Sequence, residues 1–260
     1  MPGVTTPLAL GIALAASLLA WAAQALSADG AVAAWLVGAM VLALLGWAGG
    51  SVLLAFFLPS TLVGRWGIGA GGASDARGER RDAVQVLANG GAAALGACAE
   101  LLAKGLGFWI LSGALATAAA DTWATSLGSR SAHDPKDLLR RTSVPRGTSG
   151  AVSWLGSWGA VAGAFVVAAT AVLVKHSPRG GIAVLLIGIA GMLLDSLLGA
   201  TVQGRFRCPA CAVSSERRRH RCGASTERVS GWRWLDNDGV NAAATTVGAL
   251  AAGLCWSLGH

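Results

Sequence analysis

The residues of this chain that could do chemistry are acidic and amide side chains inside, or at the edge of, long apolar stretches. They are Asp121, Asp195 and Asp238, with Asn89 and Asn241. Ionisable groups are expensive inside a membrane and usually serve a function there. Carboxylate and amide oxygens are the ligands that Mg²⁺ prefers, and Mg²⁺ commonly shares them with substrate phosphates. We therefore predict that these side chains hold one or two magnesium ions beside a phosphorylated substrate.

Three of these residues are expected at one depth in the membrane. Counted from the same end of their predicted spans, Asn89, Asp121 and Asp195 stand seven or eight residues in. At 1.5 Å per residue, each lies roughly 10–12 Å from one membrane surface. Asp238 and Asn241 begin a further span at that surface and, being three residues apart, share a helix face. A purely structural hydrogen-bonding role is the alternative for any one of the acidic residues.

The segment Arg146-Gly147-Thr148-Ser149-Gly150 comes directly before an apolar stretch in which we predict a helix from residue 149. Backbone N–H groups at a helix N-terminus, together with the positive end of the helix dipole, bind phosphate. We expect this segment to cradle an anion, with Arg146 stabilising charge that develops at phosphorus. The alternative is an ordinary helix start capped by Thr148 or Ser149.

Four potential metal ligands follow in the spacing C-x2-C-x8-H-x-C. They are Cys208, Cys211, His220 and Cys222. Four nitrogen and sulfur ligands suit a tetrahedral structural Zn²⁺ site, and a reducing cytoplasm disfavours disulfides. The H-x-C spacing departs from common zinc patterns and adjacent arginines oppose a cation, so solvated thiols are the alternative.

Composition defines the scaffold that must position these groups. The chain has 260 residues, 54% of them hydrophobic and 13% charged, and its mean hydropathy is +0.58. A soluble domain carries about 25% charged residues, so the composition indicates an integral membrane protein and excludes disorder, a coiled coil and a disulfide scaffold. We predict one all-α domain over residues 1–260, a polytopic bundle of about eight transmembrane helices. The expected spans are 7–26, 31–46, 48–64, 83–103, 107–128, 149–174, 181–203 and 238–258, the second and third being separated by a glycine-containing breaker at 45–50.

Most of the 20 Lys and Arg residues fall into three predicted loops, 65–82, 129–148 and 204–236. All three follow odd-numbered spans and therefore lie on one side, which the positive-inside rule makes cytoplasmic. Both termini are then outside, and a bacterial inner membrane is expected. The net charge of +7 is thus a signal of topology, and we expect no nucleic-acid partner.

Five segments closely resemble, in the right order, the signature blocks of a multi-pass membrane family of largely unknown function. That family includes animal transmembrane protein 19 and the plant phytyl-phosphate kinase, and the resemblance covers about residues 30–255. The segments are GERRDAVQVLANGG (78–91), ADTWATSLG (120–128), VPRGTSGAVS (144–153), DSLLGATVQ (195–203) and LDNDGVN (235–241). The polar positions that match the family's are Asp82, Asn89, Asp121, Thr148, Asp195, Asp236, Asn237 and Asn241.

The resemblance implies a CTP-dependent, kinase-like activity that converts a prenyl-type monophosphate to the diphosphate. The Cys and His set is not shared by every member, so a zinc ion would be accessory. The sequence has no Walker A motif, so the nucleotide would bind by another device.

Together these observations predict a Mg²⁺-dependent phosphotransferase at the cytoplasmic membrane face, with a phytyl or isoprenyl monophosphate as substrate and CTP as donor. We expect Asp121, Asp195 and Arg146 to be catalytic. The expected substrate- and phosphate-binding residues are Asp82, Asn89, Gly147, Thr148, Ser149, Gly150, Asn237 and Asn241. One alternative is a lipid or small-anion transporter or flippase, whose site normally lies near the membrane midplane. The other is a structural or assembly membrane protein.

Overall fold

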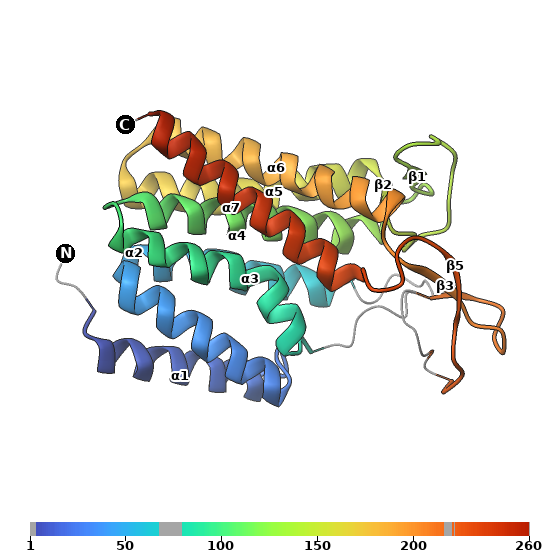
Figure 1. Cartoon of the computed structure of the whole chain (residues 1–260), viewed down its shortest axis with the longest axis horizontal. Helices are drawn as coiled ribbons and strands as arrows, with labels where there is room; N and C mark the ends of the chain where they lie inside the picture. Colours follow the sequence, from blue (N-terminus) through green and yellow to red (C-terminus); the bar gives the residue numbers. More distant parts are fainter. Residues whose placement is uncertain (1–3, 68–79, 216–219, 221, 260) are drawn as a thin grey trace.

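A computed structural model describes residues 4–67, 80–215, 220 and 222–259. Residues 68–79, 216–219 and 221, which belong to two predicted basic loops, lie outside this description. The helices are α1 (Thr6–Ala22), α2 (Ala28–Gly67), α3 (Ala83–Ala97), the 3₁₀ turn η1 (Cys98–Leu101), α4 (Leu106–Gly128), α5 (Trp154–Lys175), α6 (Pro178–Thr201) and α7 (Asn237–Leu258). The short strands are β1 (Lys136–Asp137), β2 (Ala151–Val152), β3 (Arg205–Arg207), β4 (Ser214–Ser215) and β5 (Glu227–Ser230). The chain is therefore a helical bundle with small antiparallel sheets at one end (Figure 1).

Four described helices are long and apolar enough to cross a membrane: α2, α5, α6 and α7. Leucines and other large apolar side chains are exposed along the bundle, for example Leu62, Leu87 and Leu173. Exposed apolar surface of this extent suits lipid rather than water. The prediction of a helical membrane protein is confirmed, whereas the count of eight spans is not confirmed and stays a prediction.

The long helix α2 is broken at Gly46, whose φ of 59° and ψ of −149° are not helical. A straight helix of 40 residues would be about 60 Å long. Yet Arg65, near its end, donates a hydrogen bond to the carbonyl of Ala23, just before its start. The chain must therefore reverse at Gly46, which confirms the predicted separation of residues 31–46 from 48–64.

Some helix ends differ from the predicted ends. α1 stops at Ala22 rather than at residue 26, because the chain turns at Gln24, with φ 60°, to form a bridge between Leu26 and Arg81. The predicted span 83–103 is α-helical only to Ala97 and tightens into η1 beyond it. Both differences shorten the apolar helices and leave the order of the helices along the chain unchanged.

Helix α4 is the centre of the bundle, because it packs against α2, α3, α5, α6 and α7. Its buried side chains are mostly small, and α5 approaches it through glycines. A Cβ added at Gly159 would lie 2.6 Å from the carbonyl oxygen of Trp123, and one at Gly163 would lie 2.6 Å from that of Ala119. Glycine at these two positions therefore lets α5 pack closely against the backbone of α4.

We expect Gly163→Ala to destabilise the protein because the new Cβ would meet backbone, which cannot rotate away. Overpacking of this kind typically costs about 1–3 kcal/mol. The matched control is Gly11→Ala, where a Cβ would have no atom within 4 Å. The measurement is the thermal unfolding midpoint of the detergent-solubilised protein. Equal midpoints for the two variants would contradict the close α4–α5 packing.

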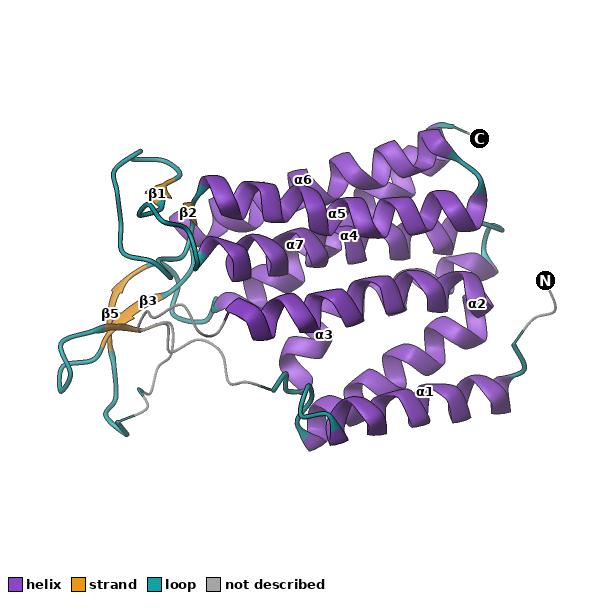
Figure 2. Cartoon of the chain, turned by 180° about the vertical axis from the view of Figure 1, so that it is seen from behind, coloured by secondary structure: helices purple, strands orange, loops and turns teal. Residues whose placement is uncertain are grey.

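The described parts of the three predicted basic loops lie at one end of the bundle, and the first turn of α1 and the last turn of α7 lie at the other (Figures 1 and 2). The two-stranded sheet β1-β2 and the three-stranded sheet β4-β3-β5 belong to the loop end. The topology of the chain across a membrane, including which end faces the cytoplasm, stays a prediction.

Candidate functional site

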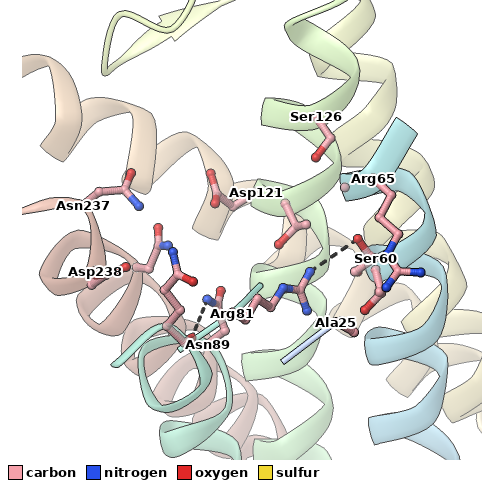
Figure 3. A pocket seen from close by; sticks show the side chains of 14 residues that line it. Ala25, Ser60, Arg65, Arg81, Asn89, Asp121, Ser126, Asn237 and Asp238 are labelled. Carbon is pink, nitrogen blue, oxygen red and sulfur yellow. Dashed lines mark hydrogen bonds between the residues drawn. The ribbon is translucent and has the colours of Figure 1, made fainter. Parts of the chain in front are cut away.

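A cavity of about 100 Å³ opens near the loop end of the bundle (Figure 3). Its walls come from the end of α2, the start of α3, the end of α4 and the start of α7. The lining residues are Ala25, Ser60, Thr61, Gly64, Arg65, Arg81, Gln85, Asn89, Asp121, Thr122, Ser126, Asn237, Asp238 and Asn241. The structure therefore brings five of the predicted residues together in one cavity wall: Asn89, Asp121, Asn237, Asp238 and Asn241.

Asn241 has a buried polar atom that a ligand could satisfy. Its side chain is only 6% exposed, and within the described part of the chain its Oδ1 atom has no hydrogen-bond partner. Burying an unsatisfied acceptor costs about 1–3 kcal/mol. The position is fixed because Thr245 donates to the carbonyls of both Asn241 and Ala88, at 2.9 Å each, which ties α7 to α3. A buried acceptor held in a pocket wall is what a bound cation or donor would satisfy.

Arg81 is the cation whose place in the pocket the sequence did not reveal. Its backbone N–H donates to the carbonyl of Ala25 at 3.0 Å, and its carbonyl accepts from Ser27 N–H at 3.0 Å. Its guanidinium donates to the carbonyl of Ser60 at 3.3 Å, across the pocket from the start of α3 (Figure 3). Arg65 supplies a second guanidinium in the lining. The pocket thus combines fixed positive charge with the carboxylates of α4 and α7.

Gln85 and Asn89 are four residues apart on one face at the start of α3, whereas Arg81 precedes the N-cap Asp82 and is placed by its backbone bridge to Leu26. Helical spacing in the sequence therefore does not identify Arg81 as a pocket residue. Asn89 uses its amide nitrogen within the helix, donating to the carbonyl of Gln85 at 2.9 Å. Its carbonyl oxygen is then the group available to a ligand in the pocket.

Asp195 lies on α6, and among the described residues it does not line the pocket. The packing of α6 against α4 shows which residue of α4 lies beside Asp195. A Cβ at Gly191 would lie 2.4 Å from Thr117, and the next residues one turn further along these parallel helices are Asp195 and Asp121. The two acidic residues thus stand at the same level of adjacent helices. Only Asp121 reaches the cavity, because the cavity opens between α2, α3, α4 and α7.

The predicted phosphate cradle differs from the structure. Helix α5 begins at Trp154, with Ser153 as its N-cap, and not at residue 149. Gly150 has a φ of 75°, and the chain continues from it into β2. Thr148 donates to the carbonyl of Pro145 at 2.7 Å. Residues 147–150 therefore do not form a helix N-terminus, and neither Thr148 nor Ser149 is its cap.

Ser149 and Arg146 have structural partners at the loop end. Gln203 donates to the Ser149 hydroxyl at 3.1 Å, and Arg205 donates to the Ser149 carbonyl at 2.8 Å. Arg146 lies 3.9 Å from a carboxylate oxygen of Asp134. Arg146 and residues 147–150 are outside the lining as far as the described residues extend. Arg81 and Arg65 line the pocket, whereas Arg146 does not, and the catalytic role of Arg146 stays a prediction.

Asp82 is also a helix cap rather than part of the pocket wall. Its carboxylate accepts from the Gln85 N–H at 2.9 Å, and the Gln85 side chain accepts from the Asp82 N–H at 3.3 Å. This reciprocal pair is a capping box, which fixes where α3 begins.

We expect Asp82→Ala to cost about 1 kcal/mol of stability, because the first turn of α3 loses its cap. Asp82→Asn keeps a good capping residue and is the matched control, expected to unfold like the wild type. Thermal unfolding of both purified variants tests this. If Asp82 bound phosphate, as the sequence suggested, Asp82→Asn would instead lose activity at unchanged stability.

The Cys and His set lies apart from the pocket, in the segment between α6 and α7. The ligand atoms of Cys208, Cys211, His220 and Cys222 all lie within 4.8 Å of one another. The pKa of the Cys222 thiol is lowered to about 6, chiefly by its hydrogen bond with His220. The pKa of Cys211 is raised to about 11, chiefly by its hydrogen bond with Cys222. The structure thus gathers the four side chains that the spacing singled out.

Comparison with known proteins gives a consistent result. The model of a family described as "Integral membrane protein DUF92" matches residues 11–249. An uncharacterised membrane protein of Synechocystis sp. is 30% identical over 84% of this chain and 78% of its own length. An uncharacterised membrane protein of Methanocaldococcus jannaschii is 32% identical over 68% of this chain and 74% of its own. Protein PGR of Arabidopsis thaliana is 30% identical over 74% of this chain and 76% of its own. No solved structure matches.

Proposed function

This chain belongs to the DUF92 family of integral membrane proteins, and from that premise we propose that it is a Mg²⁺-dependent phosphotransferase at one face of the membrane. Its acceptor is a prenyl-type monophosphate, phytyl or isoprenyl, which it converts to the diphosphate. The donor that the family resemblance implies is CTP. The predicted cytoplasmic side is retained as part of this proposal.

One observation carries the proposal: the pocket joins two guanidiniums to two carboxylates and a buried amide oxygen that has no hydrogen-bond partner among the described residues. The residues are Arg65, Arg81, Asp121, Asp238 and Asn241. Phosphoryl transfer is catalysed mainly by positioning the reactants and neutralising their charge. Guanidinium groups bind phosphate oxygens well because their donors are planar and paired. Arg81, held by backbone contacts and by Ser60, is suited to orient the acceptor phosphate.

The oxygen atoms of this pocket fit a magnesium ion. Asp121, Asp238 and Asn241 would hold it, since Mg²⁺ takes carboxylate and amide oxygens and shares its remaining positions with phosphates. The Oδ1 atom of Asn241, buried without a partner among the described residues, supports this fit. The ion would supply positive charge against the phosphate oxygens. Asp195, one helix away at the same level, would add negative charge that favours a cation there.

The surroundings of the pocket favour a substrate with a lipid tail. The helices that form its walls expose large apolar side chains outward, including Leu58 and Leu62 on α2 and Leu87 on α3. A phosphate can enter from the polar loop end while an isoprenoid chain lies along these helices in the lipid. The exposed fractions of Leu62 (66%) and Leu87 (50%) are those of side chains that contact the surrounding medium.

A transporter is supported less well by the same geometry. Transport sites usually lie near the membrane midplane between repeats, at helices that are broken there. The pocket instead draws on the last turns of α2 and α4 and the first turns of α3 and α7. Its walls are therefore close to one end of the bundle.

The test is a mass-spectrometric assay of the purified protein in detergent. Phytyl or geranylgeranyl monophosphate is supplied with Mg²⁺ and either CTP or ATP. Formation of the prenyl diphosphate and the nucleoside diphosphate in equal amounts is expected. No product with either nucleotide, from protein whose cooperative thermal unfolding shows that it is folded, would overturn the proposal. Liposome uptake assays would then address transport.

A further inference from the structure

The segment between α6 and α7 contains a second chemical cluster, separate from the pocket. Its donors are the sulfur atoms of Cys208, Cys211 and Cys222 and a ring nitrogen of His220, all within 4.8 Å of one another. We propose that these four groups bind one structural Zn²⁺ ion, which holds this segment in its fold. The inference does not depend on the phosphotransferase activity proposed above.

The distances in the cluster are those of a metal site rather than of a disulfide. The sulfur atoms of Cys208 and Cys222 are 3.6 Å apart. A tetrahedron with Zn–S bonds of about 2.3 Å has sulfur atoms about 3.8 Å apart, whereas a disulfide bond is about 2.05 Å long. His220 Nδ1 lies 3.1 Å from the Cys222 sulfur, so the ring is next to the same centre. Three sulfurs and one imidazole are a common structural zinc set.

Two tight turns deliver the ligands. In the first, the N–H of Cys208 donates to the carbonyl of Val213, and the N–H of Ala212 donates to the carbonyl of Cys208, both at 2.9 Å. In the second, the N–H of Gly223 donates to the carbonyl of His220 at 2.9 Å. Ala212 has a φ of 57°, an unfavourable conformation for alanine that the surroundings must maintain. A metal that joins the two turns would maintain it.

The sheet that carries the first turn is too small to be stable through burial alone. Strand β3 has three residues, β4 has two, and all four residues of β5 are exposed. Among the described residues between α6 and Leu235, the buried apolar side chains are those of Phe206 and Cys208. Small units with so little core usually need a disulfide or a metal. Zinc binding would supply folding free energy directly.

The charge of the proposed site suits its neighbourhood. Zinc ligands bind as thiolates, so three thiolates and one Zn²⁺ give a net charge of −1. The segment carries many arginines, among them Arg205, Arg207 and Arg228. The arginines, which seemed to oppose a bare cation, therefore favour the metal together with its thiolates.

The segment also fixes the start of α7. The N–H of Gly204 donates to the carbonyl of Leu235 at 2.8 Å, and Gln203 forms a bridge with Trp232. Asp236 then caps α7, and Asn237 and Asp238 follow in the pocket wall. A metal that stabilises the segment would thus hold this wall in place without touching a substrate.

The experiment measures zinc by elemental analysis in the full-length protein, purified under reducing conditions without chelator. One zinc per chain is expected. The double variant Cys208→Ser/Cys222→Ser should lose it, while Cys98→Ser/Cys255→Ser, which changes cysteines outside the cluster, should keep it. A chelator should lower the unfolding midpoint of the wild type, and added Zn²⁺ should restore it.

A further pair of measurements guards against misfolding of the serine variants. His220→Cys should retain one zinc, because four cysteines are also a structural zinc set. Wild-type protein loaded with Co²⁺ should show the visible absorption bands of tetrahedral thiolate coordination. Wild-type protein without stoichiometric zinc, or a Cys208–Cys222 disulfide found by peptide mapping, would overturn the proposal. Because metal content is the readout, this failure is distinguishable from failure of the activity assay.

Discussion

Asp121→Asn is expected to lower diphosphate formation about 100- to 1000-fold, a magnitude typical of losing one electrostatic contribution to the transition state. Asp121 would make that contribution indirectly, by holding the Mg²⁺ ion that offsets the phosphate charge. The substitution keeps the size of the side chain and removes the charge that α4 contributes to the pocket. A neutral amide holds a magnesium ion weakly, so the ground state and the transition state both lose the cation's charge. The measurement is the initial rate of product formation by mass spectrometry at saturating substrate.

The matched control for this variant is Asp134→Asn. Asp134 is an acidic residue of the same end of the bundle, is exposed and lies beside Arg146 at the surface. We expect its rate to stay within about twofold of the wild type, because exposed ion pairs contribute little. Equal rates for Asp121→Asn and the wild type, from folded protein, would remove Asp121 from the mechanism.

Asn241→Leu is expected to abolish stabilisation by Mg²⁺ without lowering the stability of the metal-free protein. Without Mg²⁺, the variant should be as stable as the wild type or more stable by about 1–3 kcal/mol, because it removes a buried acceptor that has no partner among the described residues. With Mg²⁺, the wild type should gain stability, by about 2.7 kcal/mol at a hundredfold excess over the dissociation constant. The variant should lose this gain. Unfolding midpoints with and without Mg²⁺, measured in detergent, test both statements.

Thr246→Val is the control for this second experiment. Thr246 is an exposed residue of the same helix, and it donates only to the carbonyl of Ala242 one turn before. Its variant should keep the wild-type response to Mg²⁺. If Asn241→Leu kept that response too, or was less stable than the wild type without the ion, the metal-binding role of Asn241 would be wrong.

The family blocks and the spacing of single residues indicated much of the candidate site correctly. Equal distances from the span ends single out Asn89 and Asp121, and a shared helix face singles out Asn241 together with Asp238; all four line the cavity. The reversal at Gly46 was equally local, since three glycines in a short apolar run disfavour a continuous helix. The proximity of Cys208 to Cys211 followed from two intervening residues.

The sequence predictions differ from the structure where contacts between distant parts of the chain decide the local conformation. The start of the apolar run predicts a helix from residue 149, but Gly150 contacts the end of α6 and the chain first forms β2 against β1. The sequence places Arg81 only in a basic loop, because its contact with Ser60 joins positions that are far apart in the sequence.

The sequence by itself determined that this is an apolar helical protein of an integral membrane family and which polar groups enter its helices. Only the tertiary structure decided that Asp121 and Asp238 share a pocket while Asp195 stands beside it on α6. The physical reason is that lipid is as apolar as the interior of a helix bundle. Hydropathy therefore identifies the segments that enter a membrane, but the faces that meet are selected by close packing, such as that of Gly191 against Thr117.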